Sequence, residues 1–381
     1  MILIKNANIF TMEDDQILTS YDILLDGKKI KEIAKNIECE EAKVIDGKGR
    51  YVTPGLVDAH THLGLFAETI GFAGSDGNDA THPITPHLRA IDSINPMDVS
   101  FAEARTGGVT TVSSGPGSAN VIGGTFTIIK TYGNRIDDMT LIKENAMKCA
   151  FGENPKRVYS GKGKLPSTRM GTAAIFRETM FKAKEYLAKK EMAKEVKDQP
   201  SFDIKMEALI PVIKKEIPLK AHAHRADDIF TAIRIAKEFD VDLTLDHCTE
   251  GHLIADYLAA EGYPAIVGPT YSGKSKFELT EKSFSTPHVL NEAGVLVSIT
   301  TDSPVIRLED LNMCAAFAHG AGMPKIEALK AITINGAKIL KLDDRIGSLK
   351  VGKDADVVVW NRHPLEINAR ADYTIIDGEI R

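Results

Sequence analysis

The sequence predicts an α/β fold, a (β/α)8 barrel with a smaller β domain beside it. The chain has 381 residues, which is enough for a barrel of about 250 residues and a second domain. Strand-like apolar runs alternate with helical stretches through its middle, the pattern of a parallel sheet. Both ends of the chain are instead rich in short β segments.

The two ends are predicted to form one composite β domain, from residues 1–52 and 346–381. The first segment contains an Asp-Gly turn signal at Asp26, and the last contains a second one at Asp377. Such pairs favour tight hairpin turns. Two β-rich ends around an α/β middle indicate one shared sheet, and the alternative is two unrelated surface hairpins.

Residues 53–345 are predicted to form the barrel. Its expected strands cover residues 56–62, 109–112, 126–129, 146–153, 219–224, 242–247, 265–269 and 295–302. Long helices are expected at 172–197 and 203–216. A loop from residue 63 to about residue 96 is long enough to indicate a functional role.

Two histidines, His60 and His62, end the first predicted strand. Side chains two residues apart on a strand point to the same face, so both imidazoles can reach one metal ion. Neutral imidazole is a common metal ligand, and ligands on a rigid strand are well positioned. The spacing alone also fits two ordinary histidines in a turn, so the later strands must decide.

Three later strands also end in residues of the kind that bind metals. His222 lies near the end of the fifth predicted strand, His247 ends the sixth and Asp302 ends the eighth. In a parallel barrel the carboxyl ends of the strands converge on one pocket. We therefore predict that these three residues bind metal together with His60 and His62.

These motifs resemble those of the amidohydrolase superfamily, metal-dependent hydrolases built on a TIM barrel. The resemblance covers nearly the whole chain. It rests on residues 54–62, Ala221-His222-Ala223, Asp246-His247 and residues 301–304. It implies one or two Zn²⁺ ions, with other divalent metals as alternatives, and a β-sandwich built from both termini.

Within that superfamily the chain is most similar to the imidazolonepropionase-like branch, which includes prolidase-like dipeptidases. It departs from imidazolonepropionase at His224, where that enzyme has an acidic residue. The loop at residues 151–157 and the long helix at 172–197 are also different. These departures leave the substrate open.

The fourth predicted strand offers two candidate ligands, Lys148 and Glu153. In many binuclear members of the superfamily, a lysine whose amine carries CO2 bridges the metals, and Lys148 matches that pattern. Burial favours the neutral amine that this N-carboxylation needs. Glu153 instead resembles a metal-binding glutamate of deacetylases. We favour Lys148 and keep Glu153 as the alternative.

Three further residues are candidates for substrate binding. His224 lies two residues after His222 and is expected to face the same pocket. Arg169 and Arg225 can hold a substrate carboxylate by bidentate pairing, although most arginines simply lie on the surface.

The resemblance implies hydrolysis of a C–N bond in a small molecule, an amide, peptide or cyclic amide. Zinc lowers the pKa of bound water to about 7, and Asp302 can carry a proton from this water to the departing nitrogen. A metal or a cationic histidine, here assigned to His247, stabilises the oxyanion. The alternatives are a ring-amine deaminase and a non-catalytic metal-binding barrel; the latter usually lacks the aspartate on strand eight.

Composition and charge indicate which partners and which cellular compartment to expect. The net charge of −6 gives no basic surface for nucleic acid, and no run approaches the roughly 18 apolar residues of a membrane span. The first residues become polar too soon for a signal peptide, and four scattered cysteines fit a reducing compartment. We expect a cytoplasmic homo-oligomer that acts on a small molecule.

Overall fold

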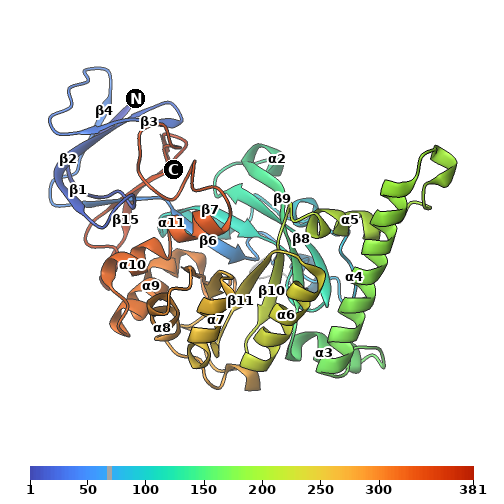
Figure 1. The fold of residues 1–381 in the computed structure, drawn as a ribbon. Coiled ribbons are helices and arrows are strands. Elements are labelled where there is room, and N and C mark those ends of the chain that lie inside the picture. The colour runs from blue at the N-terminus through green and yellow to red at the C-terminus, as the bar shows by residue number, and fades with distance from the viewer. Residues whose placement is uncertain (67–70) are drawn as a thin grey trace.

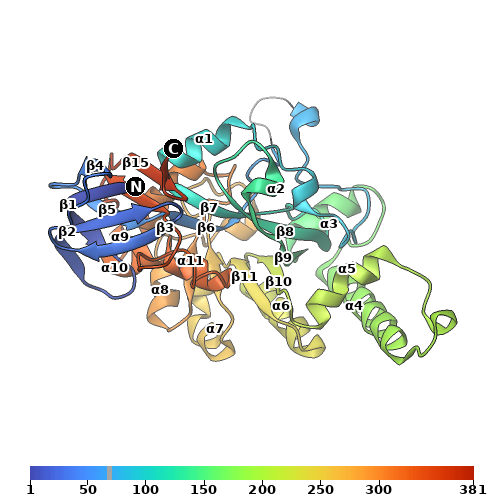
Figure 2. The same cartoon turned by 90° about the horizontal axis from the view of Figure 1, so that it is seen from above.

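The computed structural model describes residues 1–66 and 71–381, and within them it contains two sheets of eight strands each. One, the terminal sheet, joins strands from both ends of the chain, and the other is the barrel sheet. Figures 1 and 2 show the terminal sheet and both chain ends on one side of the barrel. The α/β class, with a TIM-like barrel and a composite β domain, is confirmed.

The terminal sheet has the strand order β16-β15-β14-β5-β1-β2-β3, and β4 also pairs with β1. Its strands are β1 (Ile2–Phe10), β2 (Ile17–Asp26), β3 (Lys29–Ala34), β4 (Lys43–Asp46), β5 (Tyr51–Pro54), β14 (Val357–Trp360), β15 (Ala371–Ile376) and β16 (Glu379–Ile380). Strand β14 pairs antiparallel with β5, so that Val357 lies opposite Pro54. The domain bounds 1–52, 346–381 and 53–345 stay a prediction.

The barrel sheet has the order β13-β12-β11-β10-β9-β8-β7-β6. Its strands are β6 (Leu56–Thr61), β7 (Val109–Ser114), β8 (Ile122–Lys130), β9 (Thr140–Ala150), β10 (Leu219–Ala223), β11 (Leu243–His247), β12 (Ala265–Val267) and β13 (Val297–Ile299). The Thr301 N–H after β13 donates to Asp58 Oδ2 on β6 at 2.9 Å. This contact brings the two outer strands together and nearly closes the barrel.

The third barrel strand differs from the all-parallel prediction. Strand β8 runs antiparallel to both of its neighbours, β7 and β9. Only residues 115–121 link β7 to β8, whereas a parallel crossover usually needs a dozen or more residues and a helix. Because β8 carries no predicted ligand, its reversal leaves the predicted metal-binding residues in place.

Helices cover the outside of the barrel (Figure 1). They are α1 (Val99–Thr106), α2 (Ile136–Met139), α3 (Glu153–Ser160), α4 (Arg169–Met192), α5 (Ile204–Ile213), α6 (Ala226–Phe239), α7 (Ala255–Glu261), α8 (Thr286–Glu292), α9 (Leu311–Gly320), α10 (Lys325–Lys330) and α11 (Ile334–Ile339). The predicted long helix is α4, which begins where Thr168 accepts a hydrogen bond from the Gly171 N–H at 3.0 Å. None of the described helices is both long and apolar enough to span a membrane.

The long loop after β6 includes residues 67–70, which lie outside the described residues. Its described part contains two short 3-10 helices, η1 (Gly71–Gly74) and η2 (Ala90–Asp92). A further 3-10 helix, η5 (Phe277–Leu279), lies in the loop between β12 and α8. All residues of β6, β10, β11, β12 and β13 are buried, so the strand ends rest on a filled barrel interior, as in other TIM barrels.

Candidate metal centre

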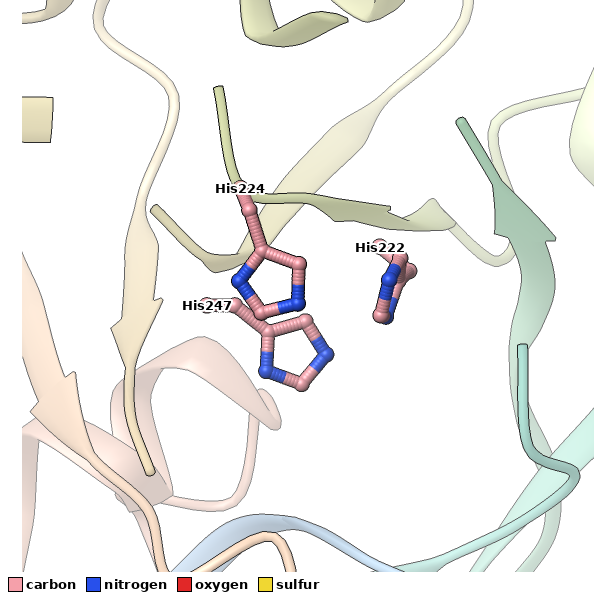
Figure 3. Close-up of side chains that lie close together, drawn as sticks. All are labelled: His222, His224 and His247. Carbon is pink, nitrogen blue, oxygen red and sulfur yellow. The ribbon is translucent and has the colours of Figure 1, made fainter. Parts of the chain in front are cut away.

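Six of the predicted side chains lie together at the carboxyl ends of β6, β10, β11 and β13. They form two groups, His60, His62 and Asp302 in the first, and His222, His224 and His247 in the second. Within each group, one potential ligand atom from each residue lies within 4.8 Å of the others. Figure 3 shows the second group, whose three imidazole rings converge from two neighbouring strands.

The two groups are adjacent. The ring centroids of His60, in the first group, and His247, in the second group, are 5.0 Å apart. In the first group, Asp302 Oδ1 lies 3.3 Å from His60 Nε2 and 3.3 Å from His62 Nε2. One carboxylate oxygen therefore faces both imidazoles of β6.

The imidazole rings are oriented by contacts on the nitrogen that faces away from the centre. His62 Nδ1 lies 2.6 Å from the Gly115 carbonyl oxygen, and His247 Nδ1 lies 2.7 Å from that of Gly268. Since a carbonyl oxygen only accepts, Nδ1 carries the proton in both rings. Each Nε2 then keeps a lone pair, the form in which histidine binds a metal.

His60 is oriented by Asp246, which precedes His247 on β11. His60 Nδ1 lies 3.0 Å from Asp246 Oδ2, and Lys220 Nζ lies 3.1 Å from Asp246 Oδ1. Asp246 and His60 are fully buried. A carboxylate on the outer nitrogen of a histidine fixes the ring and raises its basicity as a ligand. The sequence placed Asp246 in a motif but did not predict this role.

The residues present fit a divalent metal. Among the described residues, His60 Nε2, Asp302 Oδ1 and Lys148 Nζ are buried and have no hydrogen-bond partner. Leaving buried polar atoms unpaired destabilises a fold. Imidazole nitrogens and carboxylate oxygens are the ligands that zinc commonly takes in proteins, so an ion would satisfy the lone pairs of His60 and Asp302.

Burial and charge set the protonation of the centre. Burial alone would raise the pKa of Asp302, but His247, His60 and His62 together hold that pKa well below its usual value. Burial lowers the pKa of His247 to about 3, and burial is also the main cause that lowers the pKa of His222 and of His224. At neutral pH the ionised Asp302 carboxylate therefore lies beside neutral imidazoles at His222, His224 and His247.

Of the two candidates on the fourth strand, Lys148 faces the centre. Its side chain is fully buried, and Nζ lies 3.6 Å from Asp246 Oδ2. Burial lowers the pKa of its amine, against the opposing charge of Asp246. Glu153 instead begins α3, and its carboxylate lies 4.0 Å from Arg157 Nη1. The structure does not place Glu153 in either histidine group.

The two predicted arginines are already bound to carboxylates. Arg169 makes three hydrogen bonds of 2.9 to 3.1 Å to Asp228. Arg225 makes two, of 2.9 and 3.1 Å, to Asp227. The Nε and Nη2 donors of each guanidinium are thus paired within the protein. Substrate binding by either arginine stays a prediction.

One residue that the sequence analysis missed lies against the second group. Glu278, on η5, is 1% exposed, and its Oε1 lies 3.8 Å from His222 Nε2 and 3.7 Å from His224 Nε2. Lys276 Nζ lies 2.5 Å from the same oxygen. The loop that contains η5 has no strand or helix periodicity in the sequence. The one signal that could have indicated Glu278 is the presence of charged residues in a loop that follows a barrel strand.

Two strained backbone positions coincide with the centre. His247 and Asp302 have φ values of 74° and 53°, in the left-handed region that costs side-chain-bearing residues of order 1–3 kcal/mol each. The Asp302 N–H donates to Thr300 Oγ1 at 2.9 Å, which helps to hold this conformation. Such strain is typical of functional residues.

Comparison with known proteins identifies the family of this chain. Residues 51–381 match the model of the Amidohydrolase family. Amidohydrolase tasK of Hapsidospora irregularis is 30% identical over 89% of this chain, and the chain spans 37% of that protein's length. A 5-methylthioadenosine/S-adenosylhomocysteine deaminase of Thermoanaerobacter pseudethanolicus is 25% identical, over 94% of this chain and 84% of the deaminase.

Two further comparisons support the predicted branch and the fold. Imidazolonepropionase of Streptococcus pyogenes serotype M49 is 24% identical over 82% of this chain and 76% of that protein. The crystal structure of an amidohydrolase from Thermotoga maritima MSB8 is 43% identical, with a TM-score of 0.96 over 100% of this chain and 99% of that one.

Proposed function

This chain belongs to the amidohydrolase family, and from that premise we propose that it hydrolyses a carbon–nitrogen bond of a small molecule in a metal-dependent reaction. The bond is an amide, peptide or cyclic amide bond. The observation that carries the proposal is the Asp302 carboxylate, whose Oδ1 lies 3.3 Å from both imidazoles of β6. Its side chain is 14% exposed, so it can meet water and substrate.

We assign the metal to residues at the strand ends. The proposed ligands are His60, His62, Lys148, His222, His247 and Asp302. One or two divalent ions fit this set, and the nitrogen-rich ligands favour zinc over magnesium or calcium. When bound, such an ion supplies Lewis acidity toward water and the scissile carbonyl.

The chain's own residues then move the proton. Asp302 accepts a proton from the attacking water while the water oxygen bonds to the carbonyl carbon. Asp302 then delivers this proton to the nitrogen as the C–N bond breaks. Both products leave without a covalent bond to the protein. Because burial keeps His247 neutral, we propose a ligand role for it in place of the oxyanion-stabilising cation.

The test is a hydrolysis panel with protein of measured zinc content. Dipeptides, N-acyl amino acids and cyclic amides are incubated with the native chain and with an Asp302→Asn variant. Release of free amine or ring opening by the native chain alone supports the proposal. A native preparation with full metal content that hydrolyses no member of the panel would argue against this substrate class.

A deaminase is the second candidate, favoured by the 25% identity to the Thermoanaerobacter deaminase over 94% of this chain. The same attack by water on an amidine carbon would release ammonia in place of an amine. Adding aminopurine nucleosides to the panel and measuring ammonia separates the two, because amide hydrolysis of acyl amino acids releases none.

A further inference from the structure

The second histidine group lacks the carboxylate that the first group has. His222, His224 and His247 offer three imidazoles, which bind a metal in their neutral form, whereas Asp302 brings a negative charge to His60 and His62. A dication held only by neutral ligands keeps its full charge in a buried site, which is unfavourable. Lys148 can supply an anion only after N-carboxylation, so an acidic side chain beside the second group would stabilise an ion there.

The geometry points to Glu278: we propose that its carboxylate binds the same divalent ion as His222 and His224, and that the Lys276 ammonium compensates its charge until the ion arrives. Neither Glu278 nor Lys276 takes part in the proposed reaction. The inference rests on the proposed function only in requiring that the chain binds divalent ions.

The distances suit such a site. Zinc lies about 2.0–2.2 Å from nitrogen and oxygen ligands, so tetrahedral ligand atoms are about 3.3–3.6 Å apart. Glu278 Oε1 lies 3.8 Å from His222 Nε2 and 3.7 Å from His224 Nε2. A movement of a few tenths of an ångström brings the carboxylate to ligand distance of an ion shared with both rings.

The rest of the carboxylate is held so that Oε1 faces the imidazoles. Glu278 Oε2 accepts a hydrogen bond from the Glu153 N–H at 3.0 Å. Gly152 allows this approach, because a Cβ at its position would lie 2.7 Å from Oε2, and its φ is +82°. The start of α3 therefore holds Glu278 Oε2, and Oε1 faces the histidines.

Lys276 is placed to exchange with the ion. Its Nζ lies 2.5 Å from Glu278 Oε1 and donates to Asn154 Oδ1 at 3.2 Å. The Lys276 side chain is 15% exposed, against 1% for Glu278, so the ammonium can move outward while the carboxylate stays. Binding of a dication at Oε1 would then release Lys276 toward the mouth of the site.

The test titrates metal-free protein with Co²⁺, whose visible absorption reports on its ligands, and counts bound ions by elemental analysis. We expect Glu278→Gln to lose at least about ten-fold in affinity for one ion, the lower limit typical even for groups that only support a ligand. The amide keeps an oxygen for the Glu153 N–H. Its Co²⁺ spectrum should change as a carboxylate ligand is lost.

Lys276→Met should act in the opposite direction and tighten the same ion, since it removes the competing cation. Glu281→Gln, at an exposed glutamate of the same loop, is the matched control and should leave affinity and spectrum unchanged. Thermal unfolding of each metal-free variant checks that all are folded.

Unchanged affinity and spectrum in Glu278→Gln would overturn the inference, as would weaker binding in Lys276→Met or a native chain that binds no Co²⁺. No substrate enters the experiment. A negative hydrolysis panel together with the expected Co²⁺ results would therefore reject the proposed reaction and leave the role of Glu278 standing.

Discussion

At the scale of single residues, the centre depends on atoms that face away from it. The outer nitrogens of His62 and His247 are bound to backbone carbonyls, and that of His60 is bound to Asp246. These contacts fix which nitrogen carries a lone pair, so the rings are prepared for a metal before one binds. Asp302 differs from the histidines in that one of its oxygens, Oδ1, contacts two imidazole rings on the side that faces the centre.

Replacing Asp302 by asparagine tests its role as proton carrier. The amide keeps the size of the side chain and one weak ligand oxygen but cannot accept the proton. General acid–base groups typically contribute 10²–10⁴-fold, so we expect kcat on the identified substrate to fall by about that factor while most of the metal remains. Kinetics and metal content are measured on one preparation.

The exposed substitution Asp344→Asn serves as the control for Asp302→Asn and should change neither quantity. An Asp302→Asn protein with full metal and a near-native kcat would exclude the proton-carrying role. Metal loss in proportion to activity loss would leave Asp302 only the role of a ligand.

The sequence predicted the residues that occupy strand ends and missed those in irregular loops. His222, His247 and Asp302 could be found because apolar strands lead directly into them, and barrel geometry brings such ends together. Glu278 reaches the same place from a loop whose path no periodicity encodes. Sequence likewise does not show that Asp228 binds the Arg169 guanidinium.

At the scale of elements, a buried ion cluster connects the barrel to the segment around β14. Lys130, the last residue of β8, lies 3.4 Å from Asp354 and 3.4 Å from Asp377 and is also paired with Asp356. Its side chain is 5% exposed. The sequence could not predict this cluster, because it depends on β8 running antiparallel, which brings Lys130 to the opposite end of the barrel from the metal centre.

We expect Lys130→Met to destabilise the fold strongly. It removes the cation shared by three carboxylates, and breaking a buried ion pair typically costs about 3–5 kcal/mol because the remaining charge is uncompensated. Urea unfolding followed by circular dichroism measures the change. Lys143→Met, at an exposed position of β9, should change the free energy of unfolding by less than about 0.5 kcal/mol. Similar losses in both variants would contradict the prediction.

At the scale of the whole molecule, Trp360 reports whether the two sheets unfold together. It is the single tryptophan of the chain, is fully buried on β14, and donates from Nε1 to Thr53 Oγ1 at 2.9 Å. It also belongs to the apolar cluster that contains barrel residues such as Leu56 and Ile299. This shared core favours one cooperative unit over two independent domains.

We therefore expect the tryptophan fluorescence and the far-ultraviolet circular dichroism to change at the same urea concentration, which is the usual test of a single transition. Trp360→Phe removes the fluorescence signal and confirms its source. A fluorescence change at a lower urea concentration than the circular dichroism change would show that the terminal sheet unfolds alone.

Metal removal should lower the stability of the whole chain, since the proposed ligands come from β6, β9, β10, β11 and the segment after β13 and meet only in the folded state. An ion that binds the native state alone adds about 2.7 kcal/mol at a free concentration of 100 times its Kd. For a chain of this size that corresponds to a rise in Tm of several degrees. Calorimetry with a chelator and with added zinc measures it. The His60→Ala/His62→Ala variant, which keeps only the second histidine group, should show a smaller zinc-dependent rise in Tm. Equal Tm values of the native chain in chelator and in zinc would contradict a metal centre built from these strand ends.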